Sequence, residues 1–125
     1  MTENCRFCLD NNLLFDSPVA STAHFYVLRN VDARFAHGAI VIPKRHTETP
    51  FEMNSDEWQD FPAALASARA LFDHADPEGF TLGWNVGAVA GQTVFHTHLH
   101  LIARFSGDAH EGNGIRRIFK TNDED

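Results

Sequence analysis

Polar and apolar residues alternate most regularly along residues 95–102, which read Phe-His-Thr-His-Leu-His-Leu-Ile. Side chains of a strand point alternately to its two faces, so Thr97, Leu99 and Leu101 are expected on one face and three imidazole rings on the other. The apolar face would anchor the strand to a core, and the rings would face a cleft or solvent. The pattern predicts a strand over residues 93–104. Its ring-bearing face consists of His96, His98 and His100.

Short apolar runs elsewhere predict the other strands. Residues 24–28 are rich in aromatic and β-branched side chains, and residues 39–42 form an apolar run that stops at Pro43. These two strands are expected to pair as a hairpin. Residues 80–86 predict a third strand, and residues 115–119 are expected to dock as a final strand or a coil.

A helix is predicted to begin at Asn54 or Ser55, because Asn54 can cap it and Glu57, three residues on, completes a capping box. Apolar residues then recur at steps of three and four, which is typical of an amphipathic helix on a sheet. Pro62 falls inside this pattern and is expected to kink the helix or to lie close to its start. The helix is expected to end near residues 74–75. Its apolar stripe consists of Trp58, Phe61, Leu65, Ala68 and Phe72.

The order of these elements predicts an α+β fold. We expect an antiparallel sheet of about five strands, with one main helix packed on one face. A length of 125 residues suits a single domain over residues 1–125. The acidic tail at about residues 120–125 is expected to fray.

Composition narrows the classes of function. The formal net charge is −7 and the sequence pI is near 5.5, which argues against general nucleic-acid binding. No run of eighteen apolar residues occurs, so no membrane span is expected. The first residues lack the basic start and apolar core of a secretory signal. These features predict a cytoplasmic protein.

The two cysteines form a Cys-x-x-Cys pair at Cys5 and Cys8. In a reducing compartment such a pair is typical of half a zinc site or of a redox motif rather than of a structural disulfide. A redox motif would be expected at a strand-to-helix junction, whereas a turn-like Asp-Asn-Asn cluster follows this pair. Half a zinc site is therefore the favoured interpretation, and a plain N-terminal turn is the alternative.

The histidine row alone leaves three interpretations open. It can be a solvated, histidine-rich strand face, a metal site that uses two or three of the rings, or a site of nucleophilic and acid–base chemistry. Imidazole suits the last of these because its ordinary pKa lies close to neutral pH.

The surrounding residues resemble the histidine triad (HIT) superfamily of nucleotide hydrolases and transferases. Residues 90–102 match its pattern of three alternating histidines preceded by Gly-Gln-Ser/Thr-Val. Residues 42–46, Ile-Pro-Lys-Arg-His, and the pair Asn85 and Gly87 match further segments of the family at compatible distances. The resemblance covers roughly residues 5–104. It implies a homodimer with a nucleotide in a cleft beside the triad.

Roles for individual residues follow from the resemblance. It implies that His98 is the nucleophile, that His100 donates a hydrogen bond to a phosphoryl oxygen, and that His96 flanks them. It also implies that Thr93 contacts the phosphate or the leaving group. The other implied substrate contacts are Asn85, Gly91, Gln92 and Asn30.

The resemblance also gives the Cys-x-x-Cys pair a purpose. Members of the family with such a pair bind zinc through it together with two histidines. The ligands carried over are Cys5, Cys8, His46 and His96, a closed structural set without an open position. The chain departs from the family pattern in three ways: His37-Gly38 reverses the usual order, Ala103 replaces a proline, and Thr97 replaces an apolar residue.

The function implied is hydrolysis at the α-phosphorus of a dinucleoside polyphosphate or a nucleoside 5′-phosphoramidate. The reaction would pass through a nucleotidyl-histidine and release a nucleoside monophosphate such as AMP. A nucleotidyltransferase is one alternative, although such chains are much longer. The other is a nucleotide-binding or zinc-dependent interaction protein with little activity. The intact His98 and His100 count against the last, because a binding module needs no nucleophile.

Overall fold

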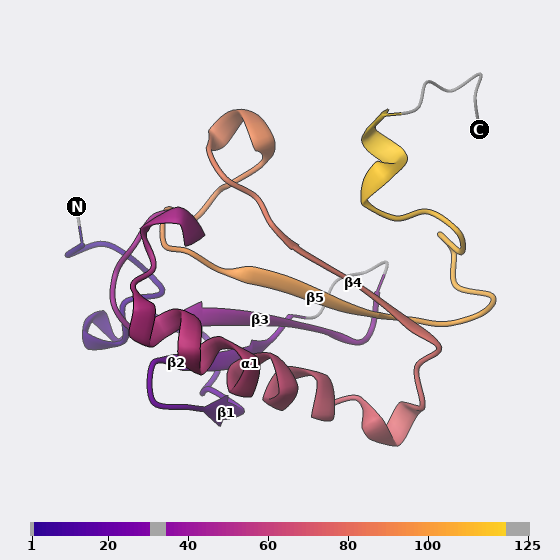
Figure 1. Cartoon of the computed structure of the whole chain (residues 1–125), viewed down its shortest axis with the longest axis horizontal. Coiled ribbons are helices and arrows are strands. Elements are labelled where there is room, and N and C mark those ends of the chain that lie inside the picture. The colour runs from indigo at the N-terminus through magenta and orange to yellow at the C-terminus, as the bar shows by residue number, and fades with distance from the viewer. Residues whose placement is uncertain (1, 31–34, 120–125) are drawn as a thin grey trace.

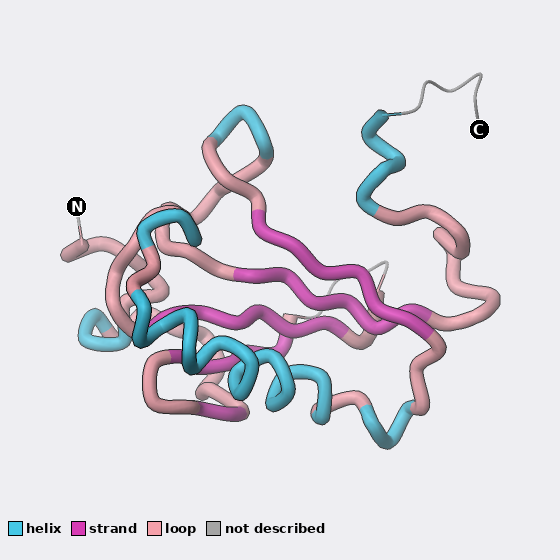
Figure 2. The backbone as a smooth tube through the Cα atoms, viewed as in Figure 1, coloured by secondary structure: helices cyan, strands magenta, loops and turns pink. Residues whose placement is uncertain are grey.

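The structure, a computed structural model, describes residues 2–30 and 35–119, with side chains up to Arg117. A five-stranded antiparallel sheet has the order β1-β2-β3-β5-β4, and α1 lies across one face of it (Figures 1 and 2). This arrangement confirms the predicted α+β class. The strands are β1 Ala20–Ser21, β2 Phe25–Arg29, β3 Gly38–Pro43, β4 Gly79–Trp84 and β5 Leu99–Arg104, and the helix is α1 Ser55–Ala70.

The predicted hairpin between the first two apolar runs is confirmed. β2 pairs antiparallel with β3, with Val27 opposite Val41. All six residues of β3 are buried, because β3 lies between β2 and β5 and is covered on both faces. β5 then pairs with both β3 and β4, which places His100 between Ile40 and Gly83.

The helix starts where the sequence predicts. The Asn54 side chain accepts a hydrogen bond from the Glu57 amide at 2.9 Å, and the Glu57 carboxylate accepts from the Asn54 amide at 2.8 Å. Pro62 lies inside α1 without ending it. Its exposed position lets water satisfy the carbonyl that the missing N–H leaves unpaired. The predicted end is wrong, since α1 stops at Ala70 and residues 73–75 form a separate 3₁₀ turn.

Two strand predictions are also corrected. β5 begins at Leu99 rather than at residue 93. The residues before it are not paired in the sheet, and His96 among them contacts Cys5 of the N-terminal segment. The fifth strand is the short β1, whereas Ile115–Phe119 forms a 3₁₀ helix. The acidic tail lies outside the described residues. In the part of the chain that is described, no helix is both long enough and apolar enough to cross a bilayer.

Two apolar clusters cover the two faces of the sheet. Under α1, Ala64, Ala68 and Phe72 pack against buried residues of the strands. On the opposite face, the N-terminal segment inserts Phe7 against a second cluster. That cluster consists of Tyr26, Leu28, Ile40 and Ile42, with Cys5, Leu14 and Val94 at its margin. The N-terminal segment therefore lies beside the histidine-bearing residues that precede β5.

Candidate functional site

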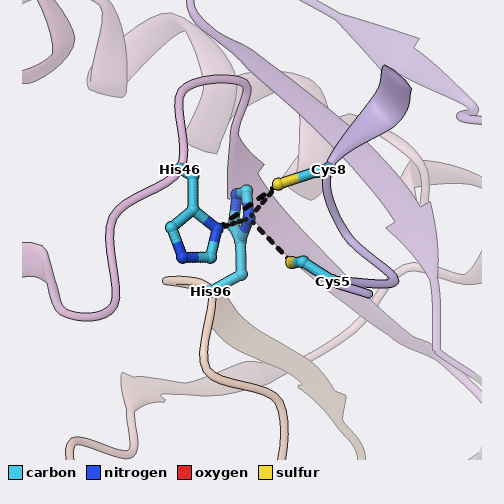
Figure 3. Close-up of side chains that lie close together, drawn as sticks. All are labelled: Cys5, Cys8, His46 and His96. Atoms are coloured by element: carbon cyan, nitrogen blue, oxygen red, sulfur yellow. Dashed lines mark hydrogen bonds between the residues drawn. The ribbon is translucent and has the colours of Figure 1, made fainter. Parts of the chain in front are cut away.

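Four predicted metal ligands converge at the end of the sheet, where the N-terminal segment meets β3 and the residues before β5 (Figure 3). Their ligand atoms all lie within 4.8 Å of one another. The Nδ1 atom of His96 is 3.4 Å from Cys5 Sγ, 3.6 Å from Cys8 Sγ and 3.2 Å from His46 Nδ1. Cys8 Sγ is 3.3 Å from His46 Nδ1. The structure thus brings together the four ligands that the sequence resemblance implies.

These separations fit a tetrahedral zinc ion. With Zn–S bonds of about 2.3 Å and Zn–N bonds of about 2.05 Å, tetrahedral angles require S···N edges of about 3.6 Å and an N···N edge of about 3.3 Å. Three of the four S···N distances are 3.3, 3.4 and 3.6 Å, the N···N distance is 3.2 Å, and every remaining separation is within 4.8 Å. Two thiolates and two neutral imidazoles are also a donor set that zinc prefers. The residues present therefore fit the metal that the sequence implies.

The backbone fixes which nitrogen His96 presents to this cluster. Its Nε2 lies 2.7 Å from the Pro43 carbonyl oxygen, which can only accept, so Nε2 carries the proton. The lone pair is consequently on Nδ1, the atom that faces the cluster. His96 is fully buried, and this burial lowers its pKa to about 4. The neutral ring that a metal requires is the form present at neutral pH.

At the Cys8 thiol, burial raises the pKa instead of lowering it. Burial, followed by the hydrogen bond and the charge of Cys5, raises the pKa of Cys8 to about 11. Without a cation the Cys8 thiol is protonated at neutral pH. A bound divalent cation reverses this preference, because it coordinates the thiolate. The cluster is thus suited to a metal ion rather than to exposed thiol chemistry.

His98 takes the opposite tautomer from His96, only two residues away. Its Nδ1 lies 2.8 Å from the His96 carbonyl oxygen, so Nδ1 donates and the lone pair is on Nε2. Among the described residues, Nε2 has no hydrogen-bond partner. Every fully buried side-chain nitrogen or oxygen of these residues does have a partner. Nε2 therefore reaches solvent, although only 8% of the residue surface is exposed. The arrangement presents an unprotonated nitrogen to the outside.

Neighbouring rings hold His98 in place and keep it neutral. Phe7 packs edge-to-face against it at 5.1 Å between centroids, and His100 lies 5.0 Å away. Burial lowers the pKa of His98, the hydrogen bond to the His96 carbonyl opposes this, and the positive charge of Arg6 lowers it further. Burial and the neighbouring His98 also lower the pKa of His100. Both rings are therefore neutral at neutral pH.

The expected single row of rings needs correction. Only His100 belongs to β5, and the ring of His96 turns to His46, at 4.9 Å between centroids, instead of lining the open face. Thr97 and Leu99 are buried, as predicted for the other face. The three histidines divide into one that faces the metal cluster and two that face outward.

Of the predicted substrate contacts, Asn85 lies beside His100, whereas others lie elsewhere. His100 and Asn85 line one cavity of about 290 Å³ on the β4 side. A Cβ atom at Gly91 would lie 3.8 Å from the Asn85 amide, and the positive φ of 99° at Gly91 suits glycine. Thr93 is exposed and lines a second cavity of about 500 Å³. Asn30 lies at the far end of β2, where its amide donates to the Gly38 carbonyl at 2.9 Å.

Gln92 is buried, and both ends of its amide are occupied by the backbone. Its Oε1 accepts from the Gly87 amide at 2.8 Å, and its Nε2 donates to the carbonyl oxygens of Glu48 and Val94 at 2.8 and 3.2 Å. In this structure Gln92 holds the glycine turn against the segment that carries His46. Its side chain leaves no group pointing to a ligand.

Sequence reasoning missed a hydroxyl pair that joins the two histidine segments. Thr47 and Thr97 are both buried, with their Oγ1 atoms 2.7 Å apart, and the Thr97 amide donates to the Thr47 carbonyl at 2.7 Å. Each threonine directly follows a metal ligand, His46 or His96. The presence of Thr97 at an apolar position of the pattern was the available signal, because a buried hydroxyl needs a partner.

A sequence model of the HIT domain matches residues 16–107 of the chain. The relative named Protein hit, from Bacillus subtilis (strain 168), is 33% identical over 127 residues, covering 98% of this chain and 83% of that protein. A solved structure of a HIT family protein from Bacillus anthracis aligns with a TM-score of 0.77 and 27% identity, covering 99% of this chain and 91% of that one. The relative named Adenylylsulfatase HINT3, from Arabidopsis thaliana, is 37% identical over 79 residues, covering 58% of this chain and 38% of that protein.

Proposed function

The chain belongs to the HIT family, a superfamily of nucleotide-binding proteins and hydrolases, and from this premise we propose that it cleaves nucleotides at the α-phosphorus. The substrate class is a dinucleoside polyphosphate or a nucleoside 5′-phosphoramidate, and the product is a nucleoside monophosphate such as AMP. The relative named adenylylsulfatase supports an adenylyl group as the part that is transferred. The single observation that carries the proposal is the outward-facing, unprotonated Nε2 of His98.

The chemistry uses His98 as a nucleophile. Its Nε2 lone pair forms a bond to the α-phosphorus, and the bond from phosphorus to the leaving group breaks. The electron pair of that bond departs with the leaving group, which takes up a proton. The oxygen of a water molecule then forms a bond to phosphorus and the water releases a proton to solvent, while the P–N bond breaks and its electron pair returns to Nε2. The His96 carbonyl supports both steps, because it accepts the hydrogen bond from Nδ1–H and so stabilises the positive ring.

The proposal assigns the binding of the phosphoryl oxygens to groups near His98. His100 lies beside it and can donate a hydrogen bond as negative charge develops. Asn85 lines the same cavity as His100, Gly91 approaches the Asn85 amide, and Thr93 offers a hydroxyl from a second cavity, so these groups are proposed as the remaining phosphate contacts. Asn30 is proposed as a contact to the ribose. Gln92 acts through the loop it holds and not through direct contact.

The metal proposal is a structural zinc ion held by the four-donor cluster of Cys5, Cys8, His46 and His96. When bound, zinc supplies a cross-link that joins the N-terminal segment to the end of β3 and to the residues before β5. The Pro43 carbonyl orients the ring of His96 by accepting a hydrogen bond from Nε2–H, which leaves Nδ1 for the ion. All four donors come from protein side chains, so the ion is not proposed to contact the substrate.

The proposal includes a homodimer. Among the described residues, β4 is an edge strand of six residues, whereas the other edge strand has only two. Leu82 on β4 and Trp58 on α1 are large apolar residues exposed near this edge. An edge of this kind favours pairing with another strand. Light scattering on the purified protein measures the mass directly, and a monomer at micromolar concentration would remove this part.

Activity is tested by following AMP release from adenosine 5′-phosphoramidate and from diadenosine tetraphosphate. Changing His98→Ala removes the nucleophile and is expected to lower kcat/KM by about 10⁴-fold or more. His74→Ala is the matched control, because His74 is an exposed histidine away from the site. A His98→Ala variant that retains wild-type turnover would refute the assignment. A wild-type protein that binds AMP but hydrolyses neither substrate would favour the alternative of a binding protein.

A further inference from the structure

A second cavity borders the site on the side of the N-terminal segment. It has a volume of about 500 Å³ and lies between that segment, the loop after β3 and the residues before β5. Thr93, which the proposed function places on a phosphoryl oxygen, forms part of its wall. The other polar residues of the lining are Asn4, Arg6 and Glu48, together with Cys5 and His46 from the four-donor cluster. The cavity is larger than the His100 cavity and contains an arginine.

Arg6 is held at the rim of this cavity by two aromatic rings. The centre of its guanidinium lies 5.3 Å from the Phe7 centroid and 5.0 Å from the Phe15 centroid. Contact with ring faces leaves the N–H donors at the guanidinium edge available for a ligand. Within the described residues Arg6 forms no ion pair, in contrast to Arg45 and Arg104.

The same Phe7 ring connects Arg6 to the proposed nucleophile. Phe7 is buried and contacts the His98 ring at 5.1 Å between centroids. Arg6 is therefore one aromatic ring away from the atom that attacks phosphorus. A cation at this position is suited to the part of a substrate that extends beyond the α-phosphoryl group.

We propose that this cavity binds the leaving group of the substrate, and that Arg6 and Thr93 select a polyanionic one, a chain of phosphates beyond the α-phosphorus. The inference rests on the proposed function, which places the α-phosphoryl group at His98. An arginine fork matches the paired oxygens of a phosphate, and the Thr93 hydroxyl donates from the same cavity. Glu48 is the one carboxylate of the lining, so it confines the anion to the Arg6 side.

This assignment favours dinucleoside polyphosphates over nucleoside phosphoramidates, whose leaving amine carries no negative charge. Of these two substrate classes, only the first supplies oxygens for Arg6. In the sequence, Arg6 lies between Cys5 and Cys8, two donors of the four-donor cluster. The metal cluster would thus also fix the backbone that carries a specificity residue.

The kinetic test compares Arg6→Gln with wild type on both substrates. The ratio of kcat/KM for diadenosine tetraphosphate to that for adenosine 5′-phosphoramidate is expected to fall about tenfold, the loss of one charge-assisted contact. Arg6→Lys should recover part of it. Arg69→Gln is the matched control, because it removes a guanidinium that stacks on Phe80 at 5.4 Å elsewhere. An unchanged ratio would overturn the inference.

A binding test separates this inference from the proposed function. Inorganic tripolyphosphate is titrated into the zinc-loaded protein by calorimetry, with zinc content measured before and after. Arg6→Gln should weaken binding about tenfold, and Arg69→Gln should leave it unchanged. Equal binding by wild type and Arg6→Gln would overturn the polyanion site. If wild type hydrolyses neither nucleotide yet shows the Arg6-dependent binding, the proposed hydrolysis fails while the anion site stands.

Discussion

The four-donor cluster and the proposed nucleophile contain histidines only two residues apart, His96 and His98, which present opposite ring nitrogens. At His96 the Pro43 carbonyl accepts a hydrogen bond from Nε2–H, so the unprotonated Nδ1 faces three other donors in a closed set. At His98 the His96 carbonyl accepts a hydrogen bond from Nδ1–H, so the unprotonated Nε2 faces outward and has no partner among the described residues. The position of one backbone carbonyl thus decides whether a buried histidine is suited to binding a metal ion or to attacking a substrate.

The two regions also differ in what they connect. The cluster joins three segments that are distant in sequence, so its loss should affect stability throughout the N-terminal part of the molecule. The His98 ring contacts Phe7 and His100, and its outward nitrogen supports no other element. Stability and activity should therefore respond to different substitutions, and the expected differences can be ranked.

The largest expected effect on stability comes from the cluster. Cys8→Ser should abolish tight metal binding and lower the free energy of unfolding by roughly 5 kcal/mol, since metal binding to such sites is coupled to folding. His98→Ala should leave the zinc content unchanged and lower the free energy of unfolding by only about 2 kcal/mol, because it removes the hydrogen bond from Nδ1 to the His96 carbonyl and the contact of a buried ring with Phe7. Denaturant unfolding and metal analysis measure both quantities. If His98→Ala loses the metal too, the two regions are not separable as described.

A smaller effect on stability is expected at the Thr47–Thr97 hydroxyl pair, which joins the segments that carry His46 and His96. Thr97→Val keeps the shape of the side chain but leaves the buried Thr47 hydroxyl without a partner, which should cost about 2 kcal/mol. Adding Thr47→Val should recover most of the lost stability, because the double variant contains no unpaired buried hydroxyl at this pair. A double-mutant cycle by chemical denaturation measures the coupling. Strictly additive losses would show that the two hydroxyls do not depend on each other.

The smallest expected effect concerns Glu57, which belongs to neither region but is ion-paired with Arg45, the residue before His46. Burial, the largest influence, raises the pKa of Glu57, but hydrogen bonds from Arg45 and the Asn54 amide, with the Arg45 charge, lower it overall. A lowered folded-state pKa contributes stability that is complete above the ordinary glutamate value of about 4.3 and is lost as pH falls through the lower value.

Glu57→Gln should therefore cost about 1 kcal/mol at pH 7, a modest figure because Arg45 is half exposed. It should also flatten the acid side of the stability profile below about pH 4.3. Denaturant unfolding at several pH values measures both. A variant whose stability falls with acid as steeply as wild type would contradict the role given to this carboxylate. Metal content at pH 7 is the control, and it should not change.

The regular patterns of the sequence predicted the sheet, the hairpin and the start of the helix. The capping box at Asn54 and Glu57 is local chemistry, so it could be identified directly. The end of the helix was placed too late, because the apolar stripe continues to Phe72 in a turn that is no longer α-helical. Tertiary packing, which one sequence does not show, kept Phe72 buried after the helix had ended.

The site was predictable where spacing carries chemistry and not where distant segments meet. The resemblance implied the four metal ligands, and the structure brings them together. Alternation predicted all three rings on one strand face, but the ring of His96 packs against His46 in the four-donor cluster and does not share that face. The Thr47–Thr97 pair and the stacking of Arg6 on Phe15 depend on contacts between segments, so no pattern within one segment revealed them.

The central claim is that Nε2 of His98 forms a transient bond to phosphorus, and trapping that bond tests it most directly. Wild-type protein is mixed with excess diadenosine tetraphosphate, quenched in alkali within milliseconds, digested and analysed by mass spectrometry. The account predicts an adenylyl group on His98 in wild type and none on that peptide in His98→Ala. An adenylyl group on His100 instead, or steady turnover with no labelled histidine at any time, would contradict it.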